Sequence, residues 1–160
     1  MAEITNATPS LTPHIVCAGA ADAIEFYKRA FGAEELIRIP GEDGKLMHAA
    51  ISIDGSMLML VDENKDWGLL SPLSLGGTPV TLHLNVPDAD AAAERAVAAG
   101  ATLTMPVADA FWGDRYGQVK DPFGHSWSIA HPLSDTAMSE GELREAARDA
   151  MCGQAEQSAA

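Results

Sequence analysis

The segments Leu11-Thr12-Pro13-His14 and Val80-Thr81-Leu82-His83 resemble each other and lie 69 positions apart. A turn glycine repeats at the same distance, as Gly55 and Gly124. Each segment precedes a stretch with helical spacing that ends in the dipeptide Gly-Ala. A repeat of this length predicts two copies of one supersecondary unit.

The first copy predicts the order strand, helix and three strands. Apolar runs and alternation favour strands, whereas apolar residues three and four apart favour a helix. Strands are expected over 11–18, 35–39, 46–53 and 57–61, with a helix over 20–31. The dipeptide Asp54-Gly55 is typical of a tight hairpin turn between the last two strands.

The second copy predicts the same order. Asp88 is a suitable N-cap for an alanine-rich helix that ends at Gly100. Strands are expected over 80–86, 101–107, 115–120 and 126–130. The chain therefore predicts an α+β fold, in which two tandem βαβββ modules form a cupped mixed sheet.

We expect one domain with five segments. They are an N-terminal arm (1–10), a first module (11–63), a linker (64–79), a second module (80–131), and a C-terminal helix and tail (132–160). The linker is rich in Gly, Ser and Pro and shows no periodicity. Ser139 and Glu142 form a capping box, which predicts a helix over 143–151 that covers a sheet edge or a subunit contact.

Composition excludes several classes of protein. The 160 residues are 47% apolar and 21% charged, as in one soluble globular domain that needs no structural metal or disulfide. A net charge of −13 disfavours nucleic acid and anionic membrane surfaces as partners. Two widely spaced cysteines, no signal peptide and no membrane-spanning apolar run predict a cytoplasmic protein.

Three motifs carry a resemblance to a known family. They are Ala23-Ile24-Glu25-Phe26-Tyr27, Met47-His48-Ala49 and Asp121-Pro122-Phe123-Gly124-His125-Ser126-Trp127. Through them the chain resembles, over residues 11–131, the vicinal oxygen chelate superfamily of glyoxalases, bleomycin-resistance proteins and extradiol dioxygenases, and most of all its PhnB-like branch. The resemblance implies paired βαβββ modules and, in the enzymes, a divalent metal in the cup of the sheet.

The positions that correspond to the family's metal ligands lack metal-binding side chains. They fall on Thr12, Met59, Thr81 and Ser128. Zn²⁺ and related ions require imidazole, carboxylate or thiolate donors, so we predict no metal cofactor. A divalent metal at a displaced site is the alternative, held by His14, His48 and His83, which alternation can bring to the cup. The same histidines are the candidate catalytic residues, or they simply line a ligand pocket.

The segment from Trp112 to Gly117 predicts a pocket rim. Trp112 would stack on a planar ligand, and Arg115 would bind a carboxylate or phosphonate. In the alternative interpretation Trp112 belongs to the core, and Arg115 pairs with Asp114 or Asp121. We expect His125 and Trp127 to be structural.

The sequence favours a protein that binds a small organic molecule in the cup without a metal. The expected ligand-binding residues are Thr12, His14, Met59, Thr81, His83, Trp112, Arg115 and Ser128. The alternative is a lyase, isomerase or epimerase that uses a displaced metal or histidine acid/base chemistry. We also expect a homodimer, and the sequence leaves open the ligand and whether modules pair within or between chains.

Overall fold

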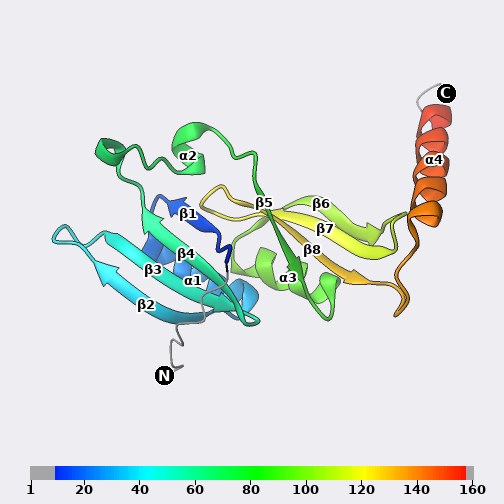
Figure 1. Cartoon of the computed structure of the whole chain (residues 1–160). Helices are drawn as coiled ribbons and strands as arrows, with labels where there is room; N and C mark the ends of the chain where they lie inside the picture. Colours follow the sequence, from blue (N-terminus) through cyan, green and yellow to red (C-terminus); the bar gives the residue numbers. More distant parts are fainter. Residues whose placement is uncertain (1–9, 158–160) are drawn as a thin grey trace.

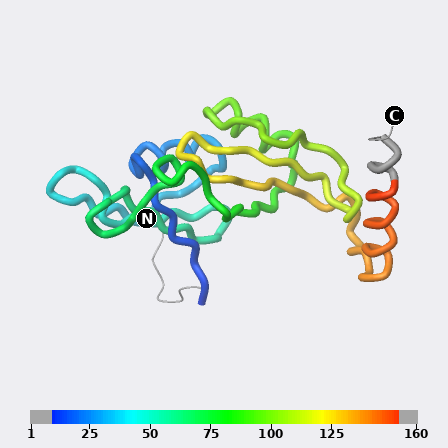
Figure 2. Tube along the Cα trace, turned by 90° about the horizontal axis from the view of Figure 1, so that it is seen from above, coloured from blue at the N-terminus to red at the C-terminus, as the bar shows by residue number. Residues whose placement is uncertain are grey.

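The computed structural model describes residues 10–157, with side chains described for residues 10–152. The first half contains β1 (His14–Cys17), α1 (Ala20–Phe31), β2 (Glu34–Pro40), β3 (Leu46–Ile53) and β4 (Ser56–Asp62). The second half contains β5 (Thr81–Asn85), α3 (Ala89–Ala99), β6 (Thr102–Asp109), β7 (Asp114–Lys120) and β8 (Ser126–Pro132). The predicted α+β fold with two βαβββ modules is confirmed, and the modules lie side by side in an elongated molecule (Figures 1 and 2).

Each module forms its own four-stranded mixed sheet, in the orders β1-β4-β3-β2 and β5-β8-β7-β6. The first and last strands of each module are parallel neighbours, and the other pairs are antiparallel. In the first sheet His14 lies opposite Met59, and in the second His83 lies opposite Ser128. Both pairs are related by the offset of 69 residues, so the duplication extends to the strand register.

The two helices cover one face of each sheet and also contact each other. Helix α1 packs on β1, β3 and β4, whereas α3 packs on β6, β7 and β8. The predicted cap of α3 is confirmed, because the Asp88 side chain accepts a hydrogen bond from the Ala91 amide at 3.0 Å. Contacts between α1 and α3 join the modules into one hydrophobic core. The opposite face of each sheet carries no helix of its own module.

Asp121 organises the aromatic end of this core. One carboxylate oxygen accepts hydrogen bonds from the Tyr27 hydroxyl at 2.7 Å and from the Trp127 indole at 2.9 Å. The other accepts from the backbone amides of Phe123 and His125, each at 2.9 Å. Trp127 and His125 are buried, which confirms their predicted structural placement.

The structure corrects two predicted elements. The first strand begins at His14 rather than at residue 11, since Pro13 has no backbone N–H to contribute to a ladder. The linker contains two short helical turns, η1 (Lys65–Trp67) and α2 (Pro72–Leu75). The expected N-terminal arm lies outside the described residues except for Ser10.

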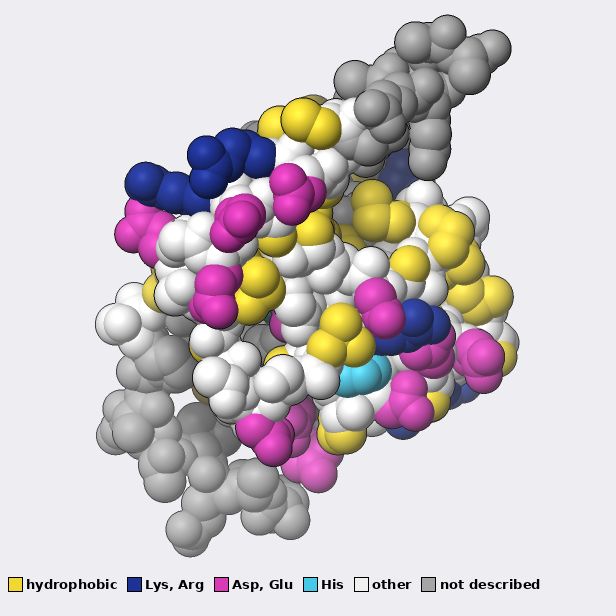
Figure 3. Space-filling model, turned by 90° about the vertical axis from the view of Figure 1, so that its right-hand side faces the viewer, with side chains coloured by type: hydrophobic (Ala, Val, Ile, Leu, Met, Phe, Trp, Pro, Cys, Tyr) yellow, Lys and Arg dark blue, Asp and Glu magenta, His cyan; other side chains and the backbone are white. Residues whose placement is uncertain are grey.

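The C-terminal helix α4 (Glu140–Gln157) is longer than predicted. Its capping box is confirmed, with the Glu142 amide donating to the Ser139 hydroxyl at 3.3 Å and the Ser139 amide to the Glu142 carboxylate at 2.8 Å. The helix projects from the end of the second module and covers no sheet edge of its own chain (Figure 1). Acidic and hydrophobic side chains are spread over this end of the molecule (Figure 3). No helix of residues 10–157 is long and apolar enough to cross a membrane.

Candidate ligand-binding site

The open face of the second sheet carries a network of polar and aromatic side chains. Alternation places Thr81, His83, Tyr116, Gln118 and Ser128 opposite the buried face formed by Val119, Trp127 and Ile129. His83 is hydrogen-bonded at both ring nitrogens, through Nδ1 to the Ser128 hydroxyl at 2.7 Å and through Nε2 to Asn85 Oδ1 at 3.2 Å. Gln118 Nε2 donates to the Tyr116 hydroxyl at 2.8 Å. These contacts hold His83 and Tyr116 in fixed orientations.

Two aromatic rings border this network. The Tyr116 ring lies nearly parallel to the His83 ring, with centroids 6.3 Å apart. Trp112 meets Tyr116 edge to face at 5.1 Å and remains 37% exposed. The surface therefore offers a planar ligand both hydrogen-bonding groups and aromatic edges.

The open face of the first sheet brings His14 and His48 together. Their ring centroids are 5.9 Å apart and the rings are nearly perpendicular. Met59 lies opposite His14 in the strand register and on the same face. Partial burial, and to a lesser extent the nearby His48 imidazole, lower the pKa of His14 below its ordinary value. A neutral imidazole at His14 is therefore favoured near pH 7.

A pocket of about 340 Å³ lies at the seam between the modules. The first module contributes Pro13, Met57 and the hairpin at Asp54. The second module contributes Thr81 and His83 among others. A ligand in this pocket would touch both modules.

The structure brings only part of the predicted histidine cluster together. His14 and His48 share the first sheet, whereas His83 lies on the second. Within the described part of the chain, no group of three His, Cys, Asp or Glu side chains could hold a metal ion. Thr12 precedes β1, and its buried hydroxyl oxygen has no hydrogen-bond partner among the described residues.

The residues at the family's metal-ligand positions do not fit a divalent transition metal. Two are threonines, one is the thioether Met59, and the fourth is Ser128. The Ser128 hydroxyl already makes a hydrogen bond with His83, and Ser128 is only 3% exposed. Neutral hydroxyls and a thioether are poor ligands for Zn²⁺, Mn²⁺ or Fe²⁺, so no metal-dependent step is assigned to these positions.

The Arg115 side chain lies on the opposite face of the sheet from Tyr116, which Trp112 contacts. It faces α3, where its guanidinium makes two hydrogen bonds to the Asp90 carboxylate, at 2.7 and 2.8 Å, and one to Asp109 at 2.9 Å. The expected ion pair is therefore present, but its partners are Asp90 and Asp109 rather than Asp114 or Asp121. These contacts raise the pKa of the Arg115 guanidinium above its ordinary value. With two carboxylates as partners, Arg115 is poorly placed to attract an anionic ligand.

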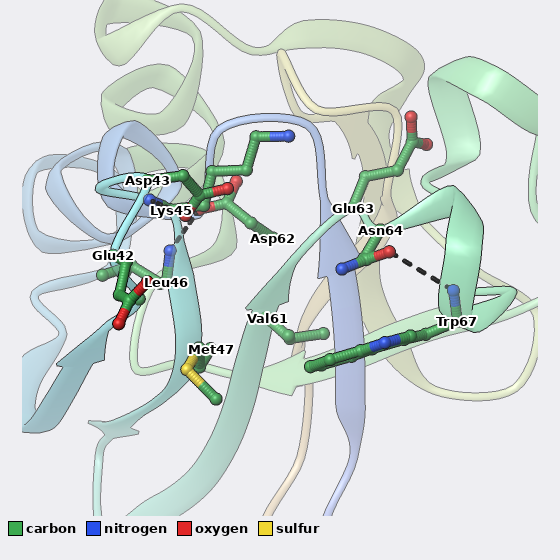
Figure 4. Close-up of a pocket in the computed structure, with 11 residues that line it drawn as sticks. Glu42, Asp43, Lys45, Leu46, Met47, Val61, Asp62, Glu63, Asn64 and Trp67 are labelled. Atoms are coloured by element: carbon green, nitrogen blue, oxygen red, sulfur yellow. Dashed lines mark hydrogen bonds between the residues drawn. The ribbon is translucent and has the colours of Figure 1, made fainter.

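Sequence reasoning missed Trp67, which forms a wall of a second pocket in the first module (Figure 4). This pocket, of about 350 Å³, also includes Met47 and Val61, and the indole of Trp67 extends toward Val61. Trp67 is 65% exposed. A large aromatic residue just before a glycine, in a linker without periodicity, was the available signal.

Comparisons with known proteins agree with this architecture. The family model of the Glyoxalase/Bleomycin resistance protein/Dioxygenase superfamily matches residues 11–129. An uncharacterized protein of Mycobacterium tuberculosis is 51% identical over 138 residues, which cover 84% of this chain and 81% of that protein.

Solved structures share the fold. TioX from Micromonospora sp. ML1 has a TM-score of 0.63 and 27% identity, with 79% of this chain and 100% of that chain covered. The PhnB protein from Bacillus cereus has a TM-score of 0.60 and 18% identity, over 77% of this chain and 99% of that one, and supports the fold alone. Together with the family match, these similarities show that the chain belongs to the glyoxalase/bleomycin resistance protein/dioxygenase superfamily.

Proposed function

We propose that this protein binds a small organic molecule on the open faces of its two sheets without the superfamily's usual metal. The observation that carries this proposal is the network around His83, Ser128 and Tyr116. Hydrogen-bonded hydroxyl, amide and imidazole groups lie on this face, and Thr81 and Ser128 stand where the superfamily's enzymes are expected to carry metal ligands. Exposed aromatic edges and a few fixed polar groups are typical of sites for planar organic ligands.

We further propose a cytoplasmic homodimer. Within the described part of the chain, the outer strands β2 and β6 each pair on one side only, and exposed apolar residues lie on both strands. Free edges of this kind are normally paired or covered. A second copy would cover surface that α1 and α3 leave open.

A thermal-shift screen of small aromatic compounds, with and without EDTA, tests the proposed function. A compound present at about one hundred times its Kd stabilises a protein by about 2.7 kcal/mol, which is readily detected. We expect the best compounds to stabilise the protein equally in EDTA, and a His83→Ala/Tyr116→Ala double variant to lose most of that stabilisation. Asp135→Asn is the control, since Asp135 is exposed and lies outside both the seam pocket and the network of His83 and Tyr116.

Element analysis of protein purified without a metal-affinity tag completes the test. We expect far less than one transition metal ion per chain. One tightly held ion per chain that is lost on replacing His14 or His83 with Ala would contradict metal-free binding. Stabilisation that disappears in EDTA would contradict it as well.

One observation favours the enzymatic alternative, a lyase, isomerase or epimerase. His14 is accessible to a ligand although part of its ring is desolvated, and its lowered pKa favours the neutral form that can accept a proton near pH 7. If the protein is such an enzyme, it will exchange an acidic C–H proton of a bound carbonyl compound with D₂O. His14→Gln should then abolish the exchange and leave binding intact, whereas equal exchange in both proteins would exclude His14 as the base.

A further inference from the structure

The pocket beside Trp67 extends the open face of the first sheet. Val61 follows Met59 by two residues on β4, so both side chains lie on the face that carries His14. Val61 and Met47 line the pocket together with Trp67 (Figure 4). The pocket volume of about 350 Å³ suits a small ligand.

Local hydrogen bonds hold Trp67 in place. The Asn64 side chain accepts from the backbone amides of Asp66 at 3.0 Å and Trp67 at 3.3 Å, which caps the η1 turn. Gly68 ends the turn with φ 71°, a left-handed conformation that favours glycine. Asn64 and Leu69 also exchange two backbone hydrogen bonds of 2.9 Å. These hydrogen bonds fix the backbone of the η1 turn, so the position of Trp67 is defined although its indole is largely exposed.

The residues that line this pocket carry a net negative charge. The lining includes four acidic residues and one basic residue, namely Glu42, Asp43, Asp62, Glu63 and Lys45. Hydrogen bonds from the Ser74 hydroxyl and the Ser71 amide lower the pKa of Glu63 to about 2, so this carboxylate is ionised near neutral pH. Asp62 accepts from the amides of three residues on other segments: Gly19, Ala20 and Leu46. The net charge of the lining favours cations over anions.

We infer that the Trp67 pocket binds a small organic cation with an apolar body, such as a quaternary or protonated amine. The cation lies over the indole face, the best aromatic partner for a positive charge, and the net negative charge of the lining adds longer-range attraction. The apolar body contacts Met47 and Val61. This inference rests on the proposed function, because it names the class of ligand for the open face of the first sheet.

NMR titration with benzyltrimethylammonium tests the inference. The chain contains three tryptophans, whose indole N–H signals are assigned with single Trp→Phe variants. We expect saturable movement of the Trp67 signal, with Trp127 unchanged in the core. Benzyl alcohol and benzoate are the neutral and anionic counterparts, and each should bind roughly tenfold more weakly or worse.

Variants separate the aromatic and charge contributions. Trp67→Leu should weaken the cation roughly tenfold, and Glu42→Gln/Asp43→Asn should weaken it severalfold without weakening benzyl alcohol. Leu133→Ala and Asp135→Asn are the controls, since both residues are exposed and lie outside the pocket.

The outcomes distinguish this inference from the proposed function. Benzyl alcohol or benzoate binding at Trp67 as tightly as the cation would overturn the cation preference and leave small-molecule binding standing. If the cation moves signals near His83 but not the Trp67 signal, the assignment of the cation site to the Trp67 pocket is wrong and small-molecule binding still stands. Failure of these probes and of the whole aromatic screen would overturn both.

Discussion

Asp121 is the residue on which the turn between β7 and β8 and the aromatic core both depend. It is 4% exposed, and its two oxygens accept four hydrogen bonds. In Asp121→Asn, an amide group would face the Tyr27 hydroxyl or the Trp127 indole, so at least one buried donor would lose its acceptor. We expect a loss of about 2 kcal/mol or more in the free energy of unfolding, measured by urea denaturation. Asp135→Asn should change it little, and a loss equal to that of this control would contradict the assigned role.

His14 should titrate below its ordinary pKa of 6.5 because burial and the His48 charge both oppose its protonation. Its proton binds more weakly in the folded chain than in the unfolded chain. The contribution of His14 to stability is therefore greatest above pH 6.5 and falls as the pH drops through the lowered pKa.

Histidine NMR titration measures this pKa directly. His48→Gln should raise the pKa of His14 only part of the way to 6.5, since burial is the larger cause. A pKa of His14 at or above 6.5 in the wild type, or a further decrease in the variant, would contradict this account.

For single residues, the alternation of side chains along a strand explains why the placement of the histidines was predicted and that of Arg115 was not. His48 and His14 were correctly expected to share a face, because a strand repeats its orientation every two residues. Arg115 immediately precedes Tyr116 on β7 and so faces the opposite side of the sheet, toward Asp90 on α3. Asp90 is 25 residues away in sequence, and no local pattern indicates such a partner.

Among the elements, β7 requires a glycine where it passes the irregular part of β6. A Cβ atom on Gly117 would lie 2.7 Å from Val107 Cγ2 and 3.2 Å from the Met105 carbonyl oxygen. The β6–β7 register shifts between Met105 and Ala108, so the backbone approaches closely there. Gly117→Ala should lower the free energy of unfolding by about 1–3 kcal/mol in urea denaturation.

Gly141 is the matched control in α4. A Cβ there meets only Ser139 Oγ at 4.0 Å, and glycine is a poor helix former. Gly141→Ala should therefore slow amide hydrogen exchange in the first turns of α4 without lowering the midpoint of global unfolding. Equal destabilisation by both substitutions would contradict the close approach of β6 and β7.

Regular elements were predictable because hydrophobic periodicity and capping residues mark them locally. Helix α1 and strand β3 match their predicted ranges, and the Ser139–Glu142 capping box begins α4 as expected. The η1 turn was missed because it is held by the Asn64 side chain and a few backbone hydrogen bonds, in a segment without periodicity. The position of Trp67 depends on that turn and was missed with it.

For the whole molecule, we predict a homodimer in solution. Exposed apolar residues lie on both outer strands, with Ile39 43% exposed on β2 and Met105 44% exposed on β6. Unpaired strands with apolar side chains favour association. Light scattering should give about twice the chain mass of 16.8 kDa at micromolar concentration. The mass of a single chain over that concentration range would contradict the homodimer and show that strands β2 and β6 are not covered by a second copy.

Chemical-shift mapping of isotopically labelled protein tests the central claim, metal-free ligand binding on the open sheet faces. The titrant is the aromatic compound that stabilises the protein most in the screen, with EDTA present throughout. We predict saturable shifts on the open faces, at His14, His48, His83, Tyr116 and Ser128, with little change in α3 around Asp90. Shifts confined to α3 and the Arg115 side of the second sheet, or no shifts until a metal is added, would contradict the claim.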